Sequence, residues 1–272
     1  MIEGFHRPAS VAEALQLWAA LGRGAFFLGG GTEINHLAGP PGVRHAISLA
    51  GLGLGGVAPT DGGLLIGAMT TIQELLESPE VHPLLQRAAA RVTNRNVRNV
   101  ATVGGHVALG KSCADLVPTL AVLDARVLVA AVGGSGAWEV LDYLCARPQG
   151  LIVAIEIPAP APARRFGLAG FKRTANDVSL INAAVALTRR DDEATGLILA
   201  MGGVASQPVR IEGVEQALQG RALPARAELE ALVADHVRPV NDLRGSSAYK
   251  RLLAGTLAAD ALIEAWTAGE AC

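Results

Sequence analysis

The sequence predicts an α+β protein with more than one domain, and three observations support this prediction. Half of its 272 residues are hydrophobic but only 4% are aromatic, so the core must be built from Ala, Leu and Val. Strand and helix patterns alternate through the first part of the chain. A proline-rich stretch, residues 158–165, favours an extended backbone and precedes two neighbouring strands and a helical C-terminal region. We therefore place a domain boundary at this stretch.

The elements before the boundary follow from hydrophobic spacing, caps and glycines. Ser10 and Glu13 form a capping-box pattern, and apolar residues then recur at helical spacing as far as Leu21. Thr71 and Glu74 form a second capping box, and Pro83 suits the first turn of a further helix. The sequence also predicts a helix around residues 116–123, strands at residues 25–30, 45–52, 63–71, 126–132 and 150–157, and a turn at residues 133–136.

Beyond the boundary, the sequence predicts a strand pair and then helices. Residues 181–190 and 195–205 read as neighbouring strands joined by a polar turn. Apolar residues between Ser247 and Gly269 fall along one long helix or two short ones.

Composition and charge exclude several classes of protein. No apolar run approaches the roughly 20 residues that cross a bilayer, and the start lacks a secretory pattern, so we expect a cytoplasmic protein without a membrane span. The net charge of −2 and the dispersed Lys and Arg disfavour nucleic-acid binding. The three cysteines are far apart and the six histidines lack ligand spacing, so we expect no metal site or iron-sulfur cluster on this chain.

Two glycine-rich segments are candidates for binding phosphate. Gly29, Gly30 and Gly31 follow a strand, and consecutive glycine amides can form a concave anion site, although a tight turn is the simpler alternative. Residues 99–108 read as a second strand-like segment interrupted by Gly104 and Gly105. Two such loops could close on the two phosphates of one dinucleotide.

A third glycine cluster, residues 51–56, fits the dinucleotide fingerprint in spacing only. Pro59 and the sequence Asp-Gly-Gly at residues 61–63 exclude the helix that this fingerprint requires. We therefore reject a Rossmann site there.

These residues resemble the FAD-binding medium subunit of molybdenum hydroxylases, the xanthine dehydrogenase and carbon monoxide dehydrogenase family. The glycine loop ending in Thr32, Glu33 and Ile34 matches one family pattern, and RNVATVGGH, residues 98–106, matches another. Further similar stretches are ADLVP, LAVLDA, IVAIEIP, FKR, GGVASQPVR and DLRGSSAYKR, in family order between residues 26 and 251. The resemblance therefore covers nearly the whole chain.

The resemblance implies a fold and a domain plan. The fold is the FAD-binding fold of vanillyl-alcohol-oxidase (PCMH) type, with two α/β subdomains, followed by a C-terminal α+β domain with a short antiparallel sheet and helices. The corresponding segments are residues 1–55, 56–163 and 164–272.

The resemblance also implies the FAD-binding residues. They are Leu28, Gly29, Gly30, Gly31, Thr32, Glu33, Ile34, Thr102, Gly104, Gly105, His106, Asp115, Ile152 and Lys172. The two glycine loops would line the diphosphate, with the Thr32 hydroxyl as an additional donor. His106 stands where the family usually has Asn.

The remaining positions would contact other parts of the cofactor. Asp115 would accept hydrogen bonds from sugar or ribityl hydroxyls, or would cap a helix. Ile152 would pack on a ring system, or would be an ordinary buried strand residue. Lys172 would raise the flavin potential from beside the isoalloxazine, or would be a solvated surface lysine.

The implied role is electron transfer, with no catalytic side chain on this chain. FAD would receive electrons from a molybdenum site through iron-sulfur clusters, so the implied partners are an iron-sulfur subunit and a large molybdopterin subunit, assembled as a dimer of heterotrimers. One alternative is a structural subunit without flavin, suggested by His106 and the unusual loop at residues 111–114. The other alternative is a stand-alone FAD-dependent oxidoreductase.

Overall fold

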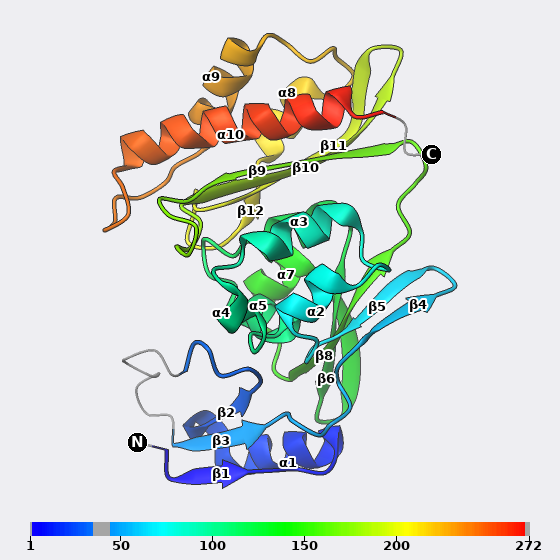
Figure 1. Ribbon diagram of the computed structural model, residues 1–272, viewed down its shortest axis with the longest axis vertical. Helices are drawn as coiled ribbons and strands as arrows, with labels where there is room; N and C mark the ends of the chain where they lie inside the picture. The colour runs from blue at the N-terminus through cyan, green and yellow to red at the C-terminus, as the bar shows by residue number, and fades with distance from the viewer. Residues whose placement is uncertain (1, 35–43, 270–272) are drawn as a thin grey trace. The chain divides into compact units, whose positions relative to one another are not determined.

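The computed structural model describes residues 2–34 and 44–269, which fall into two compact units (Figure 1). Unit 1 comprises Met1–Val81, Asn94–Leu109 and Arg126–Ile157. Unit 2 comprises His82–Thr93, Gly110–Ala125 and Pro158–Cys272. The chain therefore passes repeatedly between the units, and residues 56–163 contribute to both. The division into three segments at residues 55 and 163 stays a prediction.

The first part of unit 1 is a parallel three-stranded sheet with a helix. The strands are β1 (Gly4–His6), β2 (Ala25–Leu28) and β3 (His45–Ser48), in the order β1-β3-β2. Helix α1 (Val11–Leu21) packs against β2 and β3, and the 3-10 helix η1 (Gly22–Gly24) follows it. The Ser10 hydroxyl caps α1 by accepting a 3.1 Å hydrogen bond from the Glu13 amide. The predicted helix and strands are confirmed here, and β1 is an addition.

The second part of unit 1 is a five-stranded sheet with short helices. The strand order is β4-β5-β8-β6-β7. The strands are β4 (Val57–Thr60), β5 (Gly63–Gly67), β6 (Arg126–Ala131), β7 (Gly134–Glu139) and β8 (Leu151–Pro158), and the helices are α2 (Ile72–Glu77), α4 (Arg95–Arg98), α5 (Val103–Leu109) and α7 (Val140–Ala146). Because β4 and β5 form an antiparallel pair directly after residues 51–56, that glycine cluster leads into a strand, as the rejection of a Rossmann site requires.

Two predictions in unit 1 are wrong. Residues 99–108 were expected to be strand-like, but most of them form α5, whose buried Val103 and Val107 lie one helical turn apart. The expected turn at residues 133–136 is mostly strand, because β7 begins at Gly134 and pairs with β6. Only residues 132 and 133 connect the two strands.

Unit 2 is an antiparallel sheet covered by helices. The strand order is β12-β11-β10-β9. The strands are β9 (Arg164–Phe171), β10 (Ile181–Arg190), β11 (Glu193–Gly202) and β12 (Val209–Arg210), and the helices are α3 (Pro83–Arg91), α6 (Leu116–Val122), α8 (Glu212–Leu218), α9 (Arg226–His236) and α10 (Ser247–Thr267). In Figure 1, α10 lies on one side of β9 and β10 and α3 on the other. This double covering explains why the first seven residues of β10 are buried without alternation.

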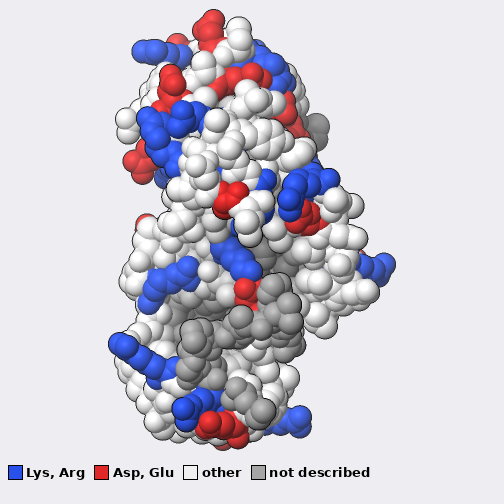
Figure 2. All heavy atoms as spheres, turned by 90° about the vertical axis from the view of Figure 1, so that its left-hand side faces the viewer, with Lys and Arg blue, Asp and Glu red and all other residues white. Residues whose placement is uncertain are grey.

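The predicted C-terminal domain with an antiparallel sheet and helices is confirmed, with the C-terminal region forming one long helix. Within the described ranges, no helix is both long and apolar enough to cross a membrane. On the face drawn in Figure 2, basic and acidic side chains are interspersed. Unit 2 also contains ion pairs between exposed side chains, such as Arg87 with Glu264 and Arg226 with Asp260.

Candidate cofactor site

The first glycine loop offers backbone donors that the protein itself does not use. Gly29 and Gly30 form a bend after β2, Gly31 has a φ of 69°, and a turn continues from Thr32. The three glycines are partly exposed, and none of their amides donates a hydrogen bond to another residue in the described part of the chain. Backbone amides are strong hydrogen-bond donors that normally have an acceptor. This loop therefore has donors available for an anionic group.

This loop packs directly on the segment that leads into the second glycine pair. A methyl group at Gly30 would overlap the carbonyl oxygen of Val100, and one at Gly29 would lie 2.9 Å from the Thr102 hydroxyl. Only glycine therefore allows the two backbones to approach so closely. The structure thus brings together the two segments that the sequence analysis paired.

The second glycine pair serves the packing of the protein. The Gly104 amide donates to the Ala68 carbonyl at 2.8 Å, and the Gly105 amide donates to the Thr102 hydroxyl at 3.2 Å. A methyl group at Gly104 would come within 2.7 Å of the Ala68 Cβ. The His106 amide is also occupied, by the Thr102 carbonyl at 2.9 Å. These amides already have acceptors, so a phosphate contact through them stays a prediction.

Asp115 lies in a buried polar cluster of unit 2. It occupies the N-cap position of α6, but its side chain makes no capping hydrogen bond. Instead its carboxylate accepts a hydrogen bond from the Ser179 hydroxyl, lies 3.5 Å from the Asn182 amide nitrogen and lies 3.7 Å from the Arg91 Nε. Burial raises the pKa of Asp115, opposed by the Ser179 hydrogen bond and by the charges of Lys172 and Arg91.

The sequence analysis did not identify Arg91, Ser179 or Asn182 as neighbours of Asp115. Their sequence positions are far from residue 115, and only folding brings them near it. One signal in the structure marks the cluster: the Arg91 Nε and the Asn182 Oδ1 are buried without a hydrogen-bond partner in the described part of the chain. Buried polar atoms without partners are unusual in proteins and often mark a functional site.

The remaining predicted residues fall in both units. Ile152 pairs with Val129 inside β8 and β6 of unit 1 and is buried. Lys172 follows β9 in unit 2, close enough to Asp115 to affect its pKa. Unit 1 therefore holds the glycine loops and Ile152, and unit 2 holds Asp115 and Lys172.

The first glycine loop and its surroundings define a class of protein. The amides of three partly exposed glycines at the end of a strand can bind phosphate oxygens without a lysine, and the exposed residue Thr32 follows them directly. The residues present therefore fit the diphosphate of a nucleotide cofactor. The loop is therefore our candidate for the phosphate-binding part of a nucleotide-cofactor site, the class of protein that this arrangement indicates.

Comparison with known proteins then gives the family. Residues 1–160 match the FAD binding domain in molybdopterin dehydrogenase, and residues 168–265 match the CO dehydrogenase flavoprotein C-terminal domain. The chain is 36% identical to the uncharacterized protein YgfM of Escherichia coli (strain K12), over 99% of both chains. It is 30% identical to the carbon monoxide dehydrogenase medium chain of Hydrogenophaga pseudoflava, over 96% of both chains.

Solved structures agree with this assignment. A carbon monoxide dehydrogenase structure from Hydrogenophaga pseudoflava matches with a TM-score of 0.88 at 28% identity, over 98% of both chains. The chain belongs to the family of FAD-binding medium subunits of molybdenum hydroxylases, which includes the carbon monoxide dehydrogenase medium chains. It is therefore an FAD-binding oxidoreductase subunit, and the predicted family, fold class and cofactor are confirmed.

Proposed function

We propose that this chain holds FAD by its diphosphate at the first glycine loop and relays electrons for a molybdenum hydroxylase complex. The observation that carries this proposal is the row of three glycine amides without protein acceptors, packed on the Val100 backbone beside the Thr102 hydroxyl. Thr32 supplies a further donor to the same phosphates. Family membership supplies the identity of the cofactor.

Bound FAD supplies the exchange of one or two electrons, and the residues of this chain bind it and adjust its potential. Lys172 is our candidate for that adjustment, because a cation favours negative charge on a nearby ring system. Lys172 lies close enough to Asp115 for its positive charge to act on that carboxyl, opposing the rise in the pKa of Asp115 that burial causes. We therefore assign Asp115 a double role, as an acceptor for cofactor hydroxyls and as a partner of this cation.

The remaining redox centres belong to partner subunits in this proposal. Relatives are named as medium chains or FAD-binding subunits, which supports assembly with other chains. No cluster of three or more metal-ligating side chains occurs among residues 2–34 and 44–269. We propose an iron-sulfur subunit and a large molybdopterin subunit as partners, in a dimer of heterotrimers.

The test is the flavin content of the purified full-length chain. We expect a yellow protein that releases FAD on denaturation, identified by its absorbance and chromatography. Calorimetric titration of FAD into chain stripped of cofactor should show saturable binding.

Two contrary outcomes would favour the alternatives. A colourless chain that takes up no added FAD would contradict the proposal and favour a structural subunit. Turnover of a simple electron donor by the isolated chain would favour a stand-alone enzyme.

A further inference from the structure

Asn182 lies between two glycines in the sheet of unit 2. In the ladder formed by β9, β10 and β11, it pairs with Gly170 on one side and with Gly202 on the other. Helices α3 and α6 pack on these strands, and Asn182 is only 1% exposed. A Cβ at Gly202 would lie 2.5 Å from the Asn182 Oδ1, so this glycine leaves room for the amide. Glycine inside a strand often marks a place where another group approaches closely.

The space over Gly170 is occupied by Arg91 of α3. A Cβ at Gly170 would lie 2.5 Å from the Arg91 Nη2, 2.9 Å from its Cζ and 3.1 Å from its Nε. The guanidinium therefore lies where a larger residue would place its side chain. The Arg91 Nε is buried and has no hydrogen-bond partner among the described residues. Because such burial carries a desolvation penalty, packing alone does not explain an arginine at this position.

The guanidinium of Arg91 faces the carboxylate of Asp115. Its Nε lies 3.7 Å from the Asp115 Oδ1, which is too far for a hydrogen bond but close enough for the two charges to interact. The hydroxyl of Ser179 and the amide of Asn182 also contact this carboxylate, and both groups are neutral. Burial raises the pKa of Asp115, and the charges of Lys172 and Arg91 oppose that rise. Gly170 therefore gives a fixed position to one of the two cations that act on Asp115.

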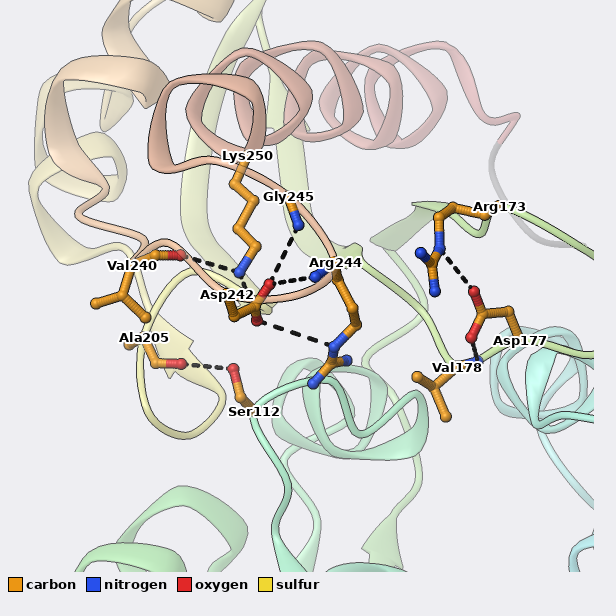
Figure 3. A network of polar contacts seen from close by, with 10 residues as sticks. All are labelled: Ser112, Arg173, Asp177, Val178, Ala205, Val240, Asp242, Arg244, Gly245 and Lys250. Carbon is orange, nitrogen blue, oxygen red and sulfur yellow. Dashed lines mark hydrogen bonds and ion pairs between the residues drawn. The ribbon is translucent and has the colours of Figure 1, made fainter.

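Other titratable groups on the same segments of chain interact with partners of their own. Asp177, in the loop between β9 and β10, accepts a 2.9 Å hydrogen bond from the Arg173 Nε (Figure 3). Cys113, two residues before Asp115, interacts with Arg244 and raises the pKa of that guanidinium. These pairs balance their charges locally, so the charges that decide the protonation of Asp115 are those of α3 and of the start of the loop.

We propose that Arg91 is a positioning residue of the cofactor site, whose charge holds Asp115 at neutral pH in the ionised form that accepts hydrogen bonds from cofactor hydroxyls. A carboxylate binds a hydroxyl more strongly than the neutral acid does, because the hydrogen bond is then charge-assisted. Arg91 acts through Asp115, and its own place depends on the absence of a side chain at Gly170. This inference rests on the proposed function, because it takes Asp115 as an acceptor for FAD.

The first experiment measures the protonation of Asp115 in the full-length chain. Urea unfolding from about pH 4 to about pH 9 compares wild type and Arg91→Gln, each with and without Asp115→Asn. The stability gained by Asp115→Asn relative to its parent increases with pH and levels off above the folded pKa of Asp115. We expect Arg91→Gln to raise the pH of levelling by about one unit, the low end for an adjacent arginine, because the Arg91 side chain is 26% exposed.

The second experiment measures FAD affinity by calorimetric titration of the stripped chain over the same pH range. We expect Arg91→Gln to bind FAD about fivefold more weakly at neutral pH, the difference between a charge-assisted and a neutral hydrogen bond. This deficit should disappear at a pH above the folded pKa of Asp115 in both chains. In chains that also carry Asp115→Asn, replacing Arg91 should leave the affinity unchanged. A merely structural defect would weaken binding at every pH.

Three further variants serve as controls for Arg91→Gln. Arg91→Lys keeps the positive charge and should restore the wild-type pH dependence. Gly170→Ala leaves Arg91 in the chain but displaces its guanidinium, so it should shift the pH of levelling in the same direction by a smaller amount. Arg87→Gln breaks the ion pair between the same helix and Glu264, and it should leave the protonation of Asp115 unchanged.

Each contrary outcome identifies which proposal fails. A pH of levelling that is the same in Arg91→Gln and wild type, or that moves equally in Arg91→Lys and Arg91→Gln, would overturn the role of the Arg91 charge. FAD affinity that falls equally at every pH would make Arg91 a structural residue and would also overturn the inference. A wild-type chain that binds no FAD would overturn the proposed function, whereas the unfolding series would still show whether Arg91 acts on Asp115.

Discussion

Gly30 and Val100 approach each other so closely that a methyl group on Gly30 would occupy the space of the Val100 carbonyl oxygen. This contact joins a loop after β2 to the residues just before α5, two segments that are 70 residues apart in sequence. Gly30 therefore has two roles. It leaves the amides of the glycine loop accessible, and it allows the two segments to pack closely.

Gly30→Ala tests the role of Gly30 in packing. The added Cβ forces one backbone to move, so we expect a loss of about 1–3 kcal/mol in the free energy of unfolding, together with loss of bound FAD. Urea unfolding and flavin absorbance measure the two effects. Gly24→Ala is the control, since nothing lies within 4 Å of its added Cβ. Wild-type stability in Gly30→Ala would show that this contact is misplaced.

Thr32→Glu tests FAD binding by the first glycine loop without altering the packing of that loop. Thr32 is exposed, so the substitution should leave stability unchanged while placing a carboxylate beside the proposed diphosphate. We expect FAD affinity to fall at least tenfold, about 1.4 kcal/mol, in calorimetric titration. Thr60→Glu introduces the same charge at another exposed threonine of unit 1 and should bind FAD normally. Equal affinities for the two variants would place the phosphates elsewhere.

The raised pKa of Asp115 predicts a specific pH dependence. The folded chain holds this proton more tightly than the unfolded chain, where the pKa is near 3.8. The stabilisation is complete below that pH and is lost as pH rises through the folded pKa. Asp115→Asn cannot ionise, so we expect its stability relative to wild type to increase with pH between 4 and 7 in urea unfolding. A relative stability that stays level or decreases over this range would mean that Arg91 and Lys172 keep Asp115 ionised.

Asp242→Asn tests the ion pair between Asp242 and Lys250, which joins the turn at residues 242–245 to α10 (Figure 3). The substitution leaves the buried Lys250 ammonium without its carboxylate, so we expect a loss of about 1–3 kcal/mol in stability. This expected loss of stability is smaller than the loss for breaking a fully buried ion pair, because the Asp242 side chain is 37% exposed to solvent. Asp260→Asn breaks the solvent-exposed ion pair with Arg226 and should cost less. Equal losses would show that burial of Lys250 contributes little.

Most helices and strands were predictable because their signals are local. The caps at Ser10 and Thr71 and the proline at residue 83 mark helix starts that the structure confirms. Residues 99–108 were predicted to be strand-like because valines favour strands, whereas in the structure the Gly104 amide, in the first turn of α5, donates to the Ala68 carbonyl. That contact is tertiary, and no sequence pattern reports it.

The candidate site was predictable to a similar extent. Its glycine loop was visible as an unusual run after a strand, and the family pattern added the second loop. The occupied amides of Gly104 and Gly105, and the Arg91 neighbour of Asp115, depend on side chains and carbonyls that fold in from distant positions. Strand β9 was also missed, because its residues, Arg164 to Phe171, follow prolines and contain two glycines.

The interleaving of the two units in sequence has a consequence for biosynthesis. Helices α3 and α6 emerge from the ribosome early, yet the sheet that buries them in unit 2 begins only at Arg164. Their apolar faces, which include Leu85, Leu116 and Leu120, must wait for most of the remaining chain to be translated. A nascent chain that ends at the proline-rich stretch therefore lacks the strands β9, β10 and β11 on which these two helices pack, so synthesis of the apolar faces precedes synthesis of their covering sheet.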